Sequence, residues 1–119
     1  DNGPMIERYR ANLARTGRTL QEPGSLASVV GSTDMGNISH LVPSIHPMIA
    51  VSPPNVAIHT ADFVRYAGGA EGDRAVLDGA KAMAATVVDL WAEPGAITAV
   101  RAEFDAALAD GRATGRATV

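Results

Sequence analysis

The chain has 119 residues, the length of one domain with a thin core. Hydrophobic residues make up 46% and charged residues 19%, which is typical of globular proteins and not of disordered ones. The formal net charge of −3 gives no electrostatic support for a nucleic-acid or anionic-membrane partner, and no apolar run approaches the roughly 18 residues of a membrane helix. The absence of cysteine excludes disulfides, thiolate zinc sites and a cysteine nucleophile, and it favours a reducing compartment, the cytoplasm.

The first predicted element is a helix over residues 4–16. Pro4 suits its first turn, Asp1 or Asn2 can provide the N-cap, and Gly17 supplies a left-handed stop. Its apolar face recurs at spacings of three and four and consists of Ile6, Tyr9 and Leu13.

Two short apolar runs are predicted to be strands. Residues 25–30 are rich in β-forming residues and lead directly into a turn. Residues 47–52 form a continuous apolar run, as expected for a strand covered on both faces, and two prolines end it.

Residues 73–92 and 96–109 show the helical period most clearly. Asp73 suits the cap or the first turn of the earlier helix, and Pro94 with Gly95 separates the two helices. The side chains that we expect to be mostly buried recur at spacings of three and four, and they are Val76, Met83, Val87, Val100 and Phe104.

This order of elements predicts an α/β fold in which helices pack on a small sheet. Two strands are fewer than a sheet usually has, so we expect residues 1–110 to be part of a larger layered α/β domain. Residues 111–119 contain a Gly-Arg-Ala-Thr repeat with little to bury, and they are predicted to be a flexible tail.

The turn after the first predicted strand is one candidate binding site. Gly31, Ser32, Thr33 and Asp34 offer backbone N–H groups and hydroxyls beyond a strand end, where ligands of α/β sheets collect, and these groups suit a carboxylate or a phosphate. The alternative is an ordinary polar turn in which Asp34 bonds its own backbone.

The three histidines are the other candidates. His59 follows an apolar stretch and could ligate zinc, or it could be a hydrogen-bonded histidine without a metal. His40 and His46 are not spaced as the helical pair of a zincin, and we assign them no role. None of the nearby serines lies in a Gly-x-Ser-x-Gly nucleophile elbow, which argues against a serine hydrolase.

The segment GSTDMGNISHLVPSIHP at 31–47, followed by IHTADF at 58–63, resembles the C-terminal end of the zinc amidohydrolases. This family includes aminoacylase, hippurate hydrolase and aminobenzoyl-glutamate hydrolase. The sequence of the segment is most similar to that of the aminobenzoyl-glutamate hydrolase branch. The resemblance implies that His59 ligates one ion of a two-zinc site. It also implies that Gly31, Ser32, Thr33 and Asp34 form a loop against the substrate.

The resemblance further implies that residues 1–110 are the C-terminal part of the catalytic domain of an enzyme that cleaves an acyl or aryl amide of an amino acid. The family's His-x-Asp motif and Glu-Glu pair, which supply other zinc ligands and the general base, do not occur here, so the chain alone is expected to be inactive. We expect uncovered apolar surface to cause self-association or homo-oligomerisation. The alternative is a non-catalytic α/β binding or interaction module.

Overall fold

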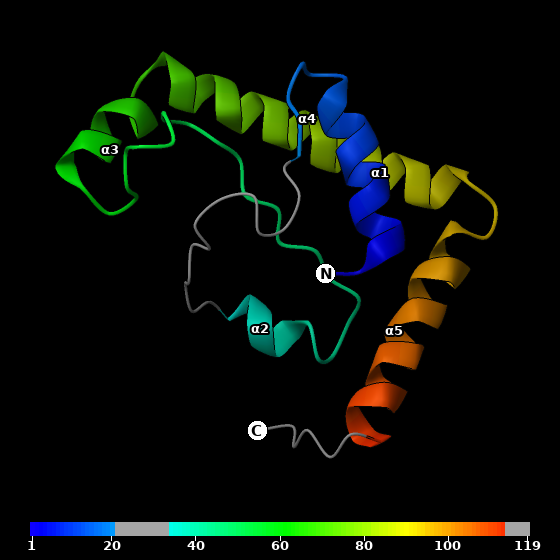
Figure 1. Ribbon diagram of the computed structural model, residues 1–119. Coiled ribbons are helices and arrows are strands. Elements are labelled where there is room, and N and C mark those ends of the chain that lie inside the picture. Colours follow the sequence, from blue (N-terminus) through cyan, green and yellow to red (C-terminus); the bar gives the residue numbers. More distant parts are fainter. Residues whose placement is uncertain (21–33, 114–119) are drawn as a thin grey trace.

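The computed structural model describes residues 1–20 and 34–113, and within these ranges the chain forms helices and no strands (Figure 1). The long helix α4 runs along the top of the view in Figure 1, and α1 and α5, from opposite ends of the sequence, both contact it. The helices are α1 (Gly3–Ala14), α2 (Met35–Ile38), α3 (Ala61–Ala67), α4 (Ala70–Ala92) and α5 (Ala96–Ala113). No described helix is both long and apolar enough to cross a membrane.

The predicted α/β fold with helices on a small sheet is therefore wrong for the described residues, in which helices pack on helices. The predicted strand at 25–30 lies outside these residues. The predicted strand at 47–52 is an extended segment without a strand partner. Ile45 and Ile49 pack instead against the helical core, and the Ala50 carbonyl accepts a hydrogen bond of 2.8 Å from the Arg18 guanidinium. Only part of this apolar run is covered by helices, since Ile49 packs on them whereas Met48 is 62% exposed, and its sequence pattern alone does not distinguish such partial cover from burial in a sheet.

Helix α1 begins one residue earlier and ends two residues earlier than the predicted range of 4–16. The Asn2 side chain accepts a hydrogen bond from the backbone N–H of Met5, and Pro4 occupies the first turn. The same Asn2 side chain donates to the Val100 carbonyl at 2.9 Å, so the cap also fastens α1 to α5. Gly17 has a φ of 83°, the left-handed conformation that glycine adopts without steric cost.

The hydrophobic core lies between α1 and α4. Tyr9 and Leu13 of α1 pack against Ala82 of α4, and each of these residues is at most 3% exposed. Half-buried apolar side chains complete the cluster, and they are Ile6, Leu20, Ile45 and Ile49. This core is small, as expected for a chain of this length.

Helix α4 presents its small and polar residues to α1 and not its large apolar ones. Its buried residues are Gly72, Ala75, Asp78, Ala82 and Thr86. The predicted burial of Val76, Met83 and Val87 is wrong, because these side chains are 71%, 57% and 43% exposed. The predicted burial of Val100 and Phe104 in α5 is confirmed. Small side chains on α4 leave room for Tyr9 and Leu13, which is the physical reason for the observed orientation.

Helices α3 and α4 meet in a close turn. A Cβ atom added to Gly72 would lie 2.1 Å from the carbonyl oxygen of Ala67, so only glycine fits there without a shift of the backbone. Glu71 and Asp73 lie in the first turn of α4, where negative charge is favoured, but neither is the N-cap, which is Gly69.

Helix α5 continues through Ala113, and residues 114–119 of the predicted tail lie outside the described residues. Two contacts from α1 hold the chain near the start of this helix. Arg8 pairs with Glu93 at 2.7 Å, and the Gly3 N–H donates to the Glu103 carboxylate at 2.7 Å.

Candidate functional site

Of the predicted substrate loop, only Asp34 lies within the described residues; Gly31, Ser32 and Thr33 lie outside them. Asp34 is exposed and occupies the N-cap position of the short helix α2. Its backbone carbonyl accepts hydrogen bonds from the N–H groups of Asn37 and Ile38, whereas its carboxylate does not cap the helix.

His59 lies immediately before α3, and its imidazole is exposed. The next residue, Thr60, is the N-cap of α3. Its hydroxyl accepts from the N–H of Phe63 at 3.2 Å and donates to the Ala57 carbonyl at 2.7 Å. The hydroxyl thus holds the backbone on both sides of His59. The exposed imidazole shows that His59 is not a core histidine.

The backbone of His59 has a φ of 63°. Among the described residues that are not glycine, no other has a positive φ. Residues in this left-handed region cost of order 1–3 kcal/mol, and they occur preferentially at functional sites, although histidine tolerates the region better than most residues. The strained conformation is an independent reason to regard His59 as a candidate site residue.

The described residues do not form a complete metal site. They contain no group of three or more histidine, cysteine, aspartate or glutamate side chains close enough to hold a metal ion. His40 and His46 are both exposed, and their backbone N–H groups bond to the Asn37 carbonyl and the Asp1 carboxylate. Because zinc requires three or four protein ligands, the donor set described in this chain does not fit a zinc centre.

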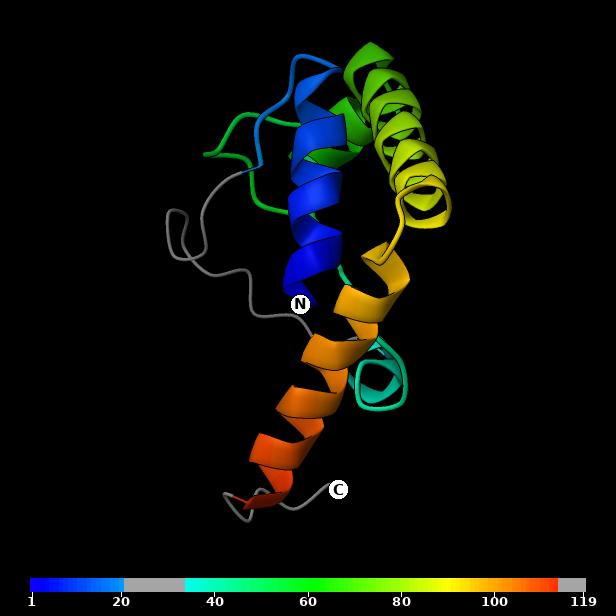
Figure 2. The same ribbon diagram turned by 90° about the vertical axis from the view of Figure 1, so that its right-hand side faces the viewer.

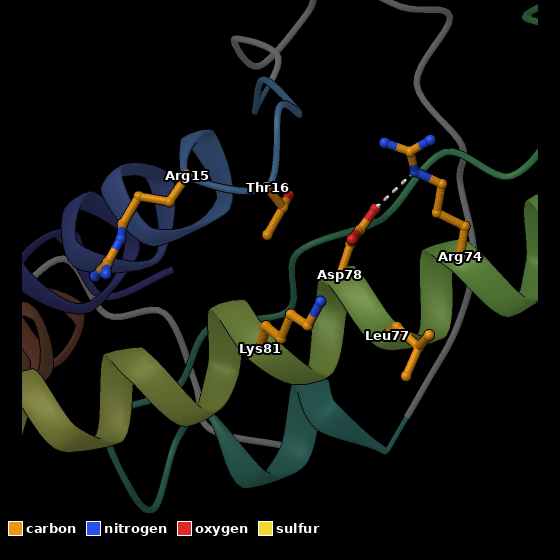
Figure 3. Close-up of a pocket in the computed structure, with 6 residues that line it drawn as sticks. All are labelled: Arg15, Thr16, Arg74, Leu77, Asp78 and Lys81. Atoms are coloured by element: carbon orange, nitrogen blue, oxygen red, sulfur yellow. Dashed lines mark ion pairs between the residues drawn. The ribbon is translucent and has the colours of Figure 1, made fainter.

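A pocket of about 530 Å³ lies elsewhere, between the end of α1 and the middle of α4 (Figure 3). Neither Asp34 nor His59 lines it. The Asp78 carboxylate lies between two cationic side chains of its own helix, one on either side. The lining residues are Arg15, Thr16, Arg74, Leu77, Asp78 and Lys81.

Asp78 is the centre of a charge network in this pocket. Its carboxylate accepts a hydrogen bond of 2.7 Å from Arg18, and Arg74 lies at 3.6 Å. The hydrogen bond from Arg18 lowers the pKa of Asp78, and the positive charges of Arg18, Arg74 and Lys81 act in the same direction, whereas burial opposes them. The sequence analysis missed this pair, although an aspartate within the apolar stretch of a long helix is a signal that it has a partner.

Comparison with known proteins gives two relevant similarities. The chain is 33% identical over 104 residues to the Xaa-Arg dipeptidase of Homo sapiens and, to the same extent, to that of Mus musculus. Each match covers 87% of this chain but only 24% of the relative, so the chain spans about a quarter of the length of these proteins. No family model matches the chain, and no solved structure matches it.

These similarities support a relationship to the peptidases and amidohydrolases. They do not identify a branch of that group, and the resemblance to aminobenzoyl-glutamate hydrolase stays a prediction.

Proposed function

We propose that this chain is part of the catalytic domain of a metal-dependent peptidase or amidohydrolase. The observation that carries the proposal is the 33% identity over 104 residues to two dipeptidases. The resemblance at residues 31–47 and 58–63 supports the same reaction class, because a dipeptidase and an amidohydrolase both hydrolyse an amide bond to an amino acid. The proposed substrate is accordingly a small molecule with an amide bond to an amino acid, and the absence of cysteine supports a cytoplasmic location.

Within that domain, we assign His59 to the metal and the 31–34 loop to the substrate. The exposed imidazole of His59 is available to a ligand, and its backbone is held in a strained conformation by Thr60. Asp34 presents an exposed carboxylate at the end of the loop.

The described residues supply at most part of such a site. His59 is one imidazole, and the described residues bring no other two ligands to it. We therefore expect no hydrolysis by the 119-residue chain alone. The general base and the remaining ligands belong to further polypeptide, consistent with relatives about four times as long as their matched part.

The test is made in the longer protein that contains this chain. Hydrolysis of a dipeptide with a C-terminal arginine and of aminobenzoyl-glutamate is measured for the wild type, His59→Ala and His40→Ala, together with bound zinc and the thermal midpoint. His59→Ala should lose at least about a hundredfold in kcat, since changes even to the hydrogen-bond partners of metal ligands cost about 10–100-fold, with little change in thermal midpoint.

His40→Ala is the matched control, because His40 is also exposed and is assigned no role. It should retain both activity and zinc. Full activity of His59→Ala would refute the ligand role, and hydrolysis of neither substrate by the wild type would refute the proposed reaction class. The ratio of the two rates distinguishes a dipeptidase from an aryl-amide hydrolase.

A further inference from the structure

His59 lies in a turn that the side chain of the next residue closes. Ile58 and His59 are the central residues of this turn, and α3 begins directly after Thr60. The Thr60 hydroxyl donates to the carbonyl of Ala57, the first residue of the turn, at 2.7 Å. Turns whose third residue has a positive φ usually carry glycine or asparagine there, whereas here the residue is His59, with a φ of 63°. The surrounding contacts must therefore hold the histidine backbone in this conformation.

Thr60 makes two hydrogen bonds with one hydroxyl group. As a donor it closes the turn on Ala57, and as an acceptor it caps α3 by receiving the N–H of Phe63 at 3.2 Å. Aspartate is a better N-cap than threonine, so the cap alone does not require a hydroxyl. An ionised aspartate only accepts hydrogen bonds, however, and it could not donate to the Ala57 carbonyl. The donated bond is therefore what distinguishes Thr60 from an ordinary helix cap.

The turn is separate from the hydrophobic core. Figure 2 shows α3 beside α4, with α5 leading away from them, whereas the described core cluster lies between α1 and α4 and includes no residue of 53–67. Both hydrogen bonds of the Thr60 hydroxyl are exposed. Core packing therefore does not account for this hydroxyl, whose bonds act on the backbone on either side of His59.

We propose that Thr60 is a positioning residue for His59. By donating to Ala57, its hydroxyl keeps the His59 backbone in the left-handed conformation and so sets the direction in which the exposed imidazole projects. The proposal rests on the proposed function, in which His59 is a site residue. It adds the group that orients His59, and it does not depend on what the imidazole binds.

The experiment compares three replacements of Thr60 in the longer protein that contains this chain. Thr60→Ser keeps both hydrogen bonds, Thr60→Asp keeps only the cap, and Thr60→Val keeps neither. For each variant and for His59→Ala, the measurements are hydrolysis of the dipeptide with a C-terminal arginine and of aminobenzoyl-glutamate, the thermal midpoint and the crystal structure. The thermal midpoint reports on the cap, whereas kcat and the φ angle of residue 59 report on the turn.

Thr60→Ser should match the wild type in all three measurements. Thr60→Asp should keep the thermal midpoint, but His59 should leave the left-handed region and kcat should fall at least about tenfold, because misplacing a group at a reacting centre by about 1 Å costs about a hundredfold. KM should change little, because the substrate's own contacts are not altered. Thr60→Val should lose kcat to the same extent, and its thermal midpoint should also fall because the cap is lost.

Thr16→Val is the matched control. The Thr16 hydroxyl makes the same kind of bond, since it donates at 2.7 Å to the carbonyl three residues earlier, that of Leu13. Thr16 follows α1, and no proposed site residue adjoins it in the chain. This variant should therefore retain the wild-type kcat.

Three results would overturn the proposal. The first is full kcat in Thr60→Asp and Thr60→Val while His59→Ala loses it, which would leave the proposed function standing and make Thr60 only a helix cap. The second is a loss of kcat in Thr60→Asp with an unchanged φ of His59, which would assign the loss to the new charge. The third is full activity of His59→Ala, or a wild type that hydrolyses neither substrate, and either result would overturn the proposed function together with this inference.

Discussion

The orientation of α4 is the feature of the fold that one pair of substitutions tests most directly. Ala82 is 1% exposed and packs against Tyr9 and Leu13, whereas the adjacent Met83 is 57% exposed. Ala82→Leu adds three carbon atoms to a filled space, and overpacking of this kind costs about 1–3 kcal/mol. Met83→Ala removes surface side chain from the monomer and should change stability by less than about 0.5 kcal/mol.

If α4 had the opposite orientation, with its large apolar residues facing the core, the expected changes in stability for the two substitutions would be exchanged. Met83→Ala would then create a cavity and cost about 2–5 kcal/mol, and Ala82→Leu would be nearly silent. The thermal midpoint is measured by circular dichroism. At roughly 4 °C per kcal/mol, Ala82→Leu should lower the midpoint by roughly 4–12 °C. A larger loss for Met83→Ala than for Ala82→Leu would refute the observed packing.

Three further predictions concern single positions. Gly72→Ala should destabilise the chain, because the new Cβ meets a backbone carbonyl of α3. Gly79→Ala should instead raise the free energy of unfolding by about 0.5–1 kcal/mol, because its Cβ would make only an ordinary contact of 3.6 Å in the middle of a helix. Urea unfolding of both variants measures the two opposite changes in stability. Asp78→Asn should lower the thermal midpoint at neutral pH. Because the pKa of Asp78 is lowered in the folded state, the higher thermal midpoint of the wild type should persist above about pH 4. The difference between the two midpoints should disappear as the pH falls further, through the folded-state pKa, and thermal scans from about pH 2 to 7 measure this difference. His59→Gly should be at least as stable as the wild type and more stable than His59→Ala, since glycine adopts a φ of 63° without strain, and equal midpoints for the two variants would contradict this.

Helices α1, α4 and α5 were predictable because their signals are local, whereas the short helices α2 and α3 were not predicted. An N-cap asparagine, a proline in the first turn and a glycine after the last turn fixed the ends of α1, and the spacing of apolar residues identified α4 and α5. The error at residues 47–52 has the same origin. An apolar run indicates burial but does not identify what buries it, and here Ile49 packs on helices.

The candidate site was less accessible to sequence reasoning. The strain at His59 depends on its φ angle, which no spacing reveals. The pairing of Asp78 with Arg18 joins residues 60 positions apart in the sequence, so the local pattern can indicate that Asp78 has a partner but not which residue it is. The family resemblance identified His59 as a candidate, but the exposure of its imidazole and the two hydrogen bonds of Thr60 came from the structure.

Polar contacts explain why α4 buries its less hydrophobic side. Burial of large apolar side chains is worth about 1.5–3 kcal/mol each, so hydrophobicity alone would turn Val76, Met83 and Val87 inward. Against this, Asn12 donates to Asp89 at 2.6 Å and to Thr86 at 3.4 Å, and Arg18 donates to Asp78 at 2.7 Å.

Rotation of α4 by half a turn would remove all these partners at once. It would leave Asn12 facing apolar side chains, and each unsatisfied buried group costs about 1–3 kcal/mol. It would also force large side chains into the space that Ala75 and Ala82 leave for α1. The polar contacts and the small residues together therefore specify which face of α4 meets α1.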